Sequence, residues 1–120
     1  MFRVLVVEDE LLIAMELEAM LADAGFEVIG PAPTVAAALE QIEKAPPDAA
    51  VLDVNLRGER VTPVAEVLLA IKVPFVLASA YLQSDLAGEP ALAGAKNVGK
   101  PTSRAALIAA LREYRARAPG

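Results

Sequence analysis

The chain has 120 residues, which is enough for one domain with a buried core and too few for a second. It contains no Cys and no His, which excludes disulfide bonds, thiolate metal sites and histidine bases or ligands. The net charge is −5 and basic residues gather only at Arg112, Arg115 and Arg117, so direct nucleic-acid binding is not expected.

The first part of the chain alternates between strand and helix patterns. Residues 3–8 form a short, mostly apolar run that is typical of a buried parallel strand. From Glu10 to Ala24, apolar residues recur at helical spacing, and Gly25 can end that helix in a left-handed turn. The segment from Phe26 to Gly30 is predicted as a second short strand.

The same alternation continues through the middle of the chain. Thr34 is predicted to cap a helix that runs to about Lys44, because its hydroxyl can accept a backbone N–H of the first turn. Residues 48–53 form the next strand, after a pair of prolines that breaks the chain. The segment from Val54 to Val61 is predicted as a polar loop.

Thr62 and Pro63 together predict the start of the third helix. Thr is a favoured N-cap, and Pro fits the first turn, where its missing N–H does no harm. We expect this helix to run to about Lys72, followed by a strand over residues 75–79.

The last part of the chain has weaker patterns. Residues 82–94 contain two glycines and a proline, so they give the weakest of the predicted helices, and residues 95–99 give a poor last strand. Thr102 or Ser103 is expected to cap the final helix. The order is thus strand then helix, five times, and right-handed crossovers would place helices on both faces of a parallel sheet.

The apolar runs are far shorter than a membrane span, so no membrane contact is expected. The first strand pattern begins at once, which leaves no place for a signal peptide. We therefore expect a single cytoplasmic domain over residues 1–120.

Acidic and polar residues stand where the predicted strands end. Glu8 and Asp9 follow the first strand, Asp53 ends the third, Ser79 ends the fourth, and Lys100 follows the last. In open parallel sheets, ligands bind in the crevice at the carboxyl ends of the strands. We therefore expect these side chains to form one site.

Glu8, Asp9 and Asp53 would repel one another in such a site. At a separation of about 4 Å, two carboxylates repel by about 4 kcal/mol at an intermediate dielectric. The group must then protonate or bind a cation, and carboxylates suit a hard divalent ion such as Mg²⁺. For any one acid alone the simpler interpretation is structural: Asp9 would cap a helix and Asp53 would start a turn.

Lys100 and Ser79 are the candidate partners of an anion at this edge. Pro101 holds the lysine backbone extended, and its ammonium can balance Asp53 or a bound anion. The Ser79 hydroxyl can hold a phosphoryl oxygen, with the Ala80 N–H as a second donor. The simpler alternatives are a solvated surface lysine and a serine that only forms a turn.

Four short motifs in this order resemble a known family. They are Glu8-Asp9 after the first strand, Asp53-x-Asn55 after the third, Ser79-Ala80 after the fourth, and Lys100-Pro101. Each is weak alone, but the ordered set is similar to the receiver domain of bacterial two-component response regulators, the CheY-like superfamily. The resemblance covers nearly the whole chain.

The resemblance implies a flavodoxin-like (βα)5 fold, an α/β structure whose five-stranded parallel sheet has the order 2-1-3-4-5. It implies that Ser79, the Ala80 N–H and Lys100 bind phosphoryl oxygens. It also implies a cis peptide bond between Lys100 and Pro101.

The resemblance further implies that Asp53 is the phosphoryl acceptor. Asp9 and Asp53 would ligate Mg²⁺ with the backbone carbonyl of Asn55, and Glu8 would act largely through water. The phosphoryl group would come from a sensor histidine kinase or a histidine phosphotransfer protein, and the output would be contact with a downstream protein. Such a domain catalyses only its own phosphorylation and dephosphorylation, so it is not an enzyme in the usual sense.

Two departures from the usual receiver concern the readout. The strand-five aromatic residue, three positions before the lysine, is replaced by Asn97. The run from Pro74 to Tyr81 resembles the Pro-Phe-x-x-Ala-Thr-Gly-Tyr motif of a mainly alphaproteobacterial subfamily. Tyr81 is therefore a switch candidate, or else only a cap over the loop, and residues 82–94 are the expected mobile segment and partner surface.

Three other functions are compatible with parts of the pattern. A degenerate receiver would bind partners without phosphate, although Asp9, Asp53 and Lys100 are all present. A phosphohydrolase with an aspartyl nucleophile usually has a second acid where this chain has Asn55. A cofactor-binding flavodoxin-like domain would need a Gly-rich phosphate loop after the first strand, and there is none in the sequence.

Overall fold

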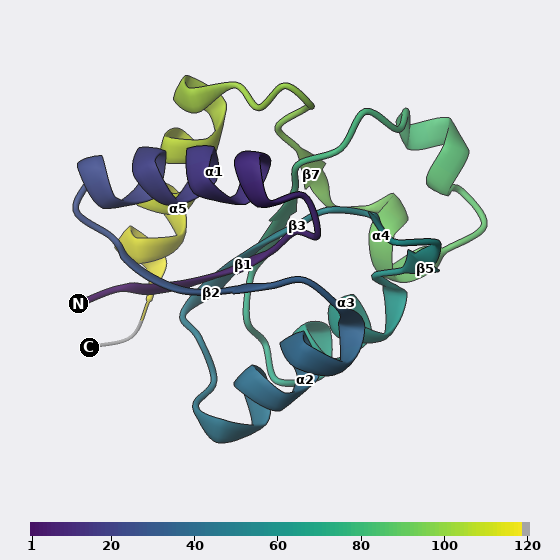
Figure 1. The fold of residues 1–120 in the computed structure, drawn as a ribbon, viewed down its shortest axis with the longest axis horizontal. Coiled ribbons are helices and arrows are strands. Elements are labelled where there is room, and N and C mark those ends of the chain that lie inside the picture. Colours follow the sequence, from purple (N-terminus) through teal and green to yellow (C-terminus); the bar gives the residue numbers. More distant parts are fainter. Residues whose placement is uncertain (119–120) are drawn as a thin grey trace.

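The computed structural model describes residues 1–118, without the side chain of Gln83. Its centre is a five-stranded parallel sheet with the order β2-β1-β3-β6-β7 (Figure 1). Counted along the chain without the small hairpin β4–β5, this is the expected order 2-1-3-4-5, so the predicted flavodoxin-like fold is confirmed. The sheet strands are β1 (Arg3–Val7), β2 (Glu27–Ala32), β3 (Ala49–Leu52), β6 (Phe75–Leu77) and β7 (Lys96–Asn97).

Helices cover both faces of the sheet. In Figure 1, α1 and α5 lie on one face, while α2, α3 and the short α4 lie on the other. A single 3₁₀ turn, η1 (Gln83–Leu86), precedes α4. The helices are α1 (Leu11–Asp23), α2 (Val35–Lys44), α3 (Thr62–Ala70), α4 (Pro90–Ala93) and α5 (Arg104–Arg117). None of the helices in residues 1–118 has the length and apolarity that crossing a membrane requires.

Strand β1 shows why the sequences of the strands are apolar at almost every position. Val4 and Val6 face the core beneath α1 and α5, whereas Leu5 and Val7 face the core beneath α2 and α3. All four are fully buried or nearly so. Because both faces of the sheet are covered, only the strand ends and the loops can present polar side chains to a ligand.

The first helix–strand connections are largely as predicted. Gly25 ends α1 with a φ of +89°, and the Thr34 hydroxyl accepts the N–H of Ala37 at 3.0 Å to cap α2. Strand β2, however, runs on to Ala32 rather than ending at Gly30. It is an edge strand, so Pro31 can lie within it although proline cannot donate to the ladder.

The prediction of a polar loop from Val54 to Val61 is wrong. This segment is an antiparallel hairpin of β4 (Asn55–Leu56) and β5 (Glu59–Arg60). Arg57 and Gly58 form its two-residue turn, and both have positive φ, 52° and 86°, as a type I′ turn requires. The hairpin is ordered by buried apolar residues at both ends and in its middle, namely Val54, Leu56 and Val61.

The predicted start of α3 is also partly wrong. Val61 is the N-cap, and Thr62 is the first helical residue. The Thr62 hydroxyl donates to Glu89 at 2.6 Å instead of capping the helix, because the preceding hairpin already fixes the entry of the chain. Pro63 lies in the first turn as predicted, and the helix ends at Ala70 rather than near residue 72.

The last third is less regular than a βα repeat. The predicted helix over residues 82–94 is replaced by η1 and α4, a single turn each, because Gly88 lies between them and Pro90 can only begin a helix. The strand predicted over residues 95–99 shrinks to β7. Ser103, not Thr102, caps α5, since its hydroxyl accepts the Ala106 N–H at 3.2 Å.

The cap of α2 gives a test of this fold. Thr34→Ala should lower the free energy of unfolding by about 1 kcal/mol, because the Ala37 N–H loses its acceptor. Thr34→Ser keeps the hydroxyl oxygen and is the matched control. Urea denaturation of the three proteins measures the effect, and equal losses in both variants would show that the hydroxyl bond is not its source.

Candidate functional site

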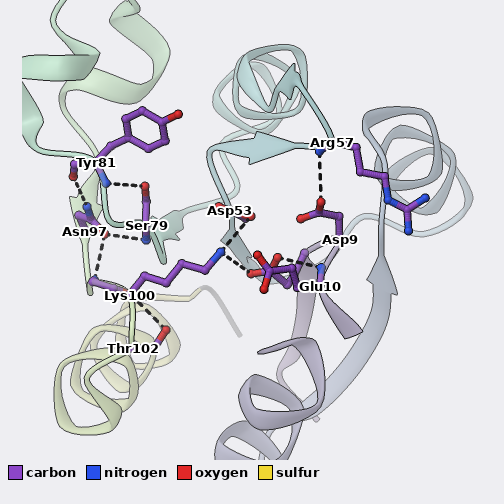
Figure 2. Close-up of polar contacts among 11 residues, drawn as sticks. Asp9, Glu10, Asp53, Arg57, Ser79, Tyr81, Asn97, Lys100 and Thr102 are labelled. Carbon is purple, nitrogen blue, oxygen red and sulfur yellow. Dashed lines mark hydrogen bonds and ion pairs between the residues drawn. The ribbon is translucent and has the colours of Figure 1, made fainter. Parts of the chain in front are cut away.

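The polar residues predicted at the strand ends lie together at the carboxyl edge of the sheet (Figure 2). Backbone hydrogen bonds extend the ladder just beyond the strands and fix the loops that carry these residues. The Asp53 N–H donates to the Val7 carbonyl at 2.9 Å, and the Ala78 N–H donates to the Leu52 carbonyl at 2.9 Å. The main chain therefore sets the relative positions of these groups.

Three carboxylates converge at this edge. Oxygen atoms of Glu8, Asp9 and Asp53 lie within 4.8 Å of one another. Glu8 and Asp53 are buried, with 2% and 7% of their surface exposed, and Asp9 is half-buried. The Lys100 ammonium contacts two of them, at 3.3 Å from Glu8 and 3.2 Å from Asp53. The four charges sum to −2 when all are ionised.

The surroundings of Glu8 hold its pKa far from the ordinary value. Burial is the main cause, and it raises the pKa of Glu8 from 4.5 to about 7. The Glu10 N–H, which donates to Glu8 at 3.1 Å, and the charge of Lys100 oppose this shift, while Asp53 adds to it. Glu8 therefore binds its proton up to a higher pH than an ordinary glutamate does.

The pKa of Lys100 moves in the direction expected for a paired ammonium. Burial alone would lower it, but the negative charges of Asp53 and Glu8 outweigh burial, so the pKa lies above its ordinary value. Lys100 therefore stays charged throughout the physiological range.

The hairpin after β3 contributes the rim of the site. Its turn places the Arg57 N–H 3.2 Å from a carboxylate oxygen of Asp9, to which it donates. Asn55, in β4, is exposed and lines the same cavity. Sequence reasoning missed the contact between Arg57 and Asp9, and the Arg-Gly pair at the turn was its only signal.

The loop after β6 forms the opposite rim. Ser79 is buried, and its hydroxyl oxygen accepts the Tyr81 N–H at 3.0 Å. Ala80 is exposed beside it, and the guanidinium carbon of Arg60 lies 4.7 Å from the centre of the Tyr81 ring. The backbone N–H of Ser79 donates to the side-chain oxygen of Asn97 at 3.1 Å.

These groups surround one cavity of about 270 Å³. Every residue singled out in the sequence as a site residue lines it except Glu8, which contacts Lys100 from within the core. The bond between Lys100 and Pro101 is cis, as the family resemblance implies. The predicted residues that line the cavity are Asp9, Asp53, Asn55, Ser79, Ala80, Tyr81 and Lys100.

Residues 4–112 match the family described as the response regulator receiver domain. The chain belongs to this family. Receiver domains are signalling domains of two-component systems, and this membership agrees with the fold and with the acidic cavity at the strand ends. The match covers all of the site residues, every strand except the first residue of β1, and most of α5.

Three known proteins place this receiver domain among its relatives. The transcriptional regulatory protein PdtaR of Mycobacterium tuberculosis is 36% identical over 91% of the chain and 54% of its own length. The structure of SdrG from Sphingomonas melonis Fr1 is 40% identical over 96% of this chain and 97% of that one, with a TM-score of 0.79. The PhyR receiver domain of Erythrobacter litoralis is 27% identical over 99% of this chain and 95% of that one, with a TM-score of 0.84.

The chain thus spans about half the length of the curated relative PdtaR. The BeF3-activated conformation of SdrG from Pseudomonas melonis Fr1 matches 92% of this chain with 39% identity and a TM-score of 0.76. The likeness to SdrG and PhyR spans the full fold of the receiver domain.

The raised pKa of Glu8 predicts how the stability of the metal-free receiver depends on pH. The folded state binds more protons than the unfolded state between pH 4.5 and about 7, so the free energy of unfolding falls as the pH rises through this range. Glu8→Gln removes this loss. At pH 8 in a chelator, the variant should exceed the wild type by about 1–3 kcal/mol.

Denaturation of both proteins at pH 5 and pH 8 measures this difference, which should shrink at the lower pH. Glu18→Gln, on the exposed side of α1, is the control for loss of one negative charge and should show little pH-dependent change. A Glu8→Gln advantage that is equal at both pH values would contradict the assignment to Glu8.

Proposed function

We propose that Asp53 accepts a phosphoryl group in a Mg²⁺-dependent reaction, and that the phosphorylated domain signals through contact with another protein. One observation carries the choice of Asp53. Its carboxylate both lines the cavity and contacts the Lys100 ammonium at 3.2 Å. Glu8 meets the same ammonium from within the core, and Asp9 lines the cavity while accepting the Arg57 N–H.

The donor set fits Mg²⁺. Three carboxylates within 4.8 Å and a single nearby ammonium leave excess negative charge, and oxygen ligands are those that a hard divalent ion prefers. Asp9 and Asp53, with the Asn55 carbonyl, would hold the ion, and Glu8 would act through water. When bound, the ion supplies positive charge that offsets the charge on the transferring phosphoryl oxygens.

A carboxylate nucleophile needs no base to take a proton from it before it attacks. An Asp53 oxygen attacks phosphorus in line, the new O–P bond forms, and the P–N bond of a phosphohistidine on the partner breaks. The departing histidine keeps the electron pair of that bond. Ser79, Ala80 and Lys100 line the cavity, where the hydroxyl, the backbone N–H and the ammonium would donate to the phosphoryl oxygens.

The partners follow from this chemistry. The chain contains no His, so the phosphohistidine would belong to a sensor histidine kinase or a histidine phosphotransfer protein. The output would be contact with a downstream protein rather than turnover of an external substrate. PdtaR is named as a transcriptional regulatory protein, which fits a receiver that controls another component.

We also propose that this domain belongs to the subfamily with the Pro-Phe-x-x-Ala-Thr-Gly-Tyr motif. The run from Pro74 to Tyr81 departs from the motif only in Ser79 and Ala80. Similarity to PhyR and SdrG supports the assignment. Tyr81 is the switch candidate, because its N–H donates to Ser79 and its ring lies under Arg60.

Phosphorylation by a small donor tests the proposed function directly. Incubation with acetyl phosphate and Mg²⁺ should add the mass of one phosphoryl group, measured on the intact protein, and a chelator should prevent the gain. Asp53→Asn should show no gain, whereas Asp23→Asn, an exposed acid on α1, should behave like the wild type.

Two outcomes would contradict the proposal. An equal mass gain in Asp53→Asn would move the acceptor to another residue. No gain in the wild type would favour a receiver that binds its partners without phosphate.

Residues 82–94 should change their motion when the site is occupied. The segment has two single-turn helices and connects the Ser79 loop to β7, so it can respond to changes around Ser79. Backbone NMR relaxation with and without BeF3⁻, a phosphoryl mimic, should differ in this segment more than in α2. Matching relaxation in the two states would contradict the proposed switch segment.

A further inference from the structure

We propose that Asn97 is a positioning residue that joins the two loops from which the phosphoryl donors come. Its side-chain oxygen accepts the Ser79 N–H at 3.1 Å and the Gly99 N–H at 2.9 Å. Its side-chain nitrogen donates to the Tyr81 carbonyl at 3.0 Å. The inference rests on the proposed function of Asp53, because it concerns how the donors around that residue are held.

The position of Asn97 explains how one side chain reaches both loops (Figure 2). Strands β6 and β7 are parallel neighbours, and their ladder continues to the bond from the Val98 N–H to the Leu77 carbonyl, at 2.8 Å. Beyond this hydrogen bond, the backbone continues to Ser79 after β6 and to Lys100 after β7. The Asn97 amide bonds to backbone groups on both sides where the ladder ends, and so replaces the missing backbone pairs.

On the β6 side, these bonds hold the turn from Ser79 to Tyr81. The Tyr81 N–H donates to the Ser79 hydroxyl oxygen, which leaves the hydroxyl proton free to donate toward the cavity. Within residues 1–118, the Ala80 N–H has no protein acceptor. Asn97 therefore binds the N–H of Ser79 and the carbonyl of Tyr81 and leaves the intervening N–H for an anion.

On the β7 side, Asn97 fixes the residue before Lys100. Gly99 has a φ of +87°, and its carbonyl accepts the Thr102 hydroxyl at 3.2 Å. Both the N–H and the carbonyl of Gly99 are therefore hydrogen-bonded, which holds the backbone that leads into Lys100. The Lys100 ammonium then extends to Asp53. Donors from two loops are thus held in one arrangement before an anion binds, which is the condition for electrostatic preorganisation.

The three bonds require an amide at this position. One short side chain must present an oxygen that accepts twice and a nitrogen that donates. Ala would leave the N–H of the buried Ser79 without its acceptor, and Asp would place an oxygen against the Tyr81 carbonyl oxygen. The aromatic residue usual at this position could make none of these backbone bonds, so this chain replaces a rotating ring with a fixed link.

The test separates the anion from the metal. Asn97→Ala should weaken BeF3⁻ binding in the presence of Mg²⁺ by about tenfold, the equivalent of one hydrogen bond's net contribution. Its affinity for Mg²⁺ alone should stay within about twofold of the wild type, since none of the three hydrogen bonds of Asn97 is made to a carboxylate. Lys96→Ala, an exposed neighbour on β7, is the matched control and should change neither.

Amide hydrogen exchange provides a readout in the wild-type protein itself. The Ser79 and Gly99 amides should exchange more slowly than the Ala80 amide, and Asn97→Ala should accelerate both. Exchange of Ser79 and Gly99 as fast as that of Ala80 in the wild type would overturn the inference, even if the variant does not fold.

The outcomes distinguish this inference from the proposed function. A wild type that binds BeF3⁻, together with an Asn97→Ala variant that binds it equally well, would overturn only the role of Asn97. Parallel losses of Mg²⁺ and BeF3⁻ affinity would also overturn it, because they would indicate a general disturbance of the site. A wild type that binds no BeF3⁻ would overturn both proposals.

Discussion

The ion pairs of Lys100 with Asp53 and Glu8 are the interactions on which this site depends. Three acids share a small volume, two of them buried, and a single ammonium lies 3.2–3.3 Å from two of these carboxylates. The charge that remains is unfavourable for the empty protein and favourable for a cation. The repulsion among the three acids therefore lowers the stability of the fold unless a proton or a cation offsets it.

The fold makes such a concentration of charge possible. Helices cover both faces of the sheet, so the strands are apolar along their length and polar only where they end. Carboxylates at those ends are partly removed from water, and this burial raises the pKa of Glu8 to about 7. The same carboxylates on a helix surface would be screened by water and would differ little from ordinary acids.

The sequence was most informative where a local pattern acts directly on the backbone. The roles of Gly25 and Thr34 could be predicted because each depends on nearby residues, whereas the strand order was expected only from the family resemblance. The positions of Asp53 and Lys100 followed from the rule that parallel strands end at one edge, and their chemical roles remain predictions. Thr62 shows the limit: a good N-cap residue instead donates to Glu89, 27 positions away, and sequence spacing does not reveal that partner.

The hairpin after β3 has one further consequence, for how such a domain diversifies. Its turn holds Asp9 through the backbone N–H of Arg57, and the Arg57 side chain takes no part in that bond. Residues that tolerate a positive φ could therefore succeed one another at this position while the hold on Asp9 persists. The Arg57 side chain at the rim could therefore vary in charge and size while the carboxylates beneath it stay in place. On the proposed function, partner recognition at the rim could thus change at a single residue without rebuilding the site beneath it.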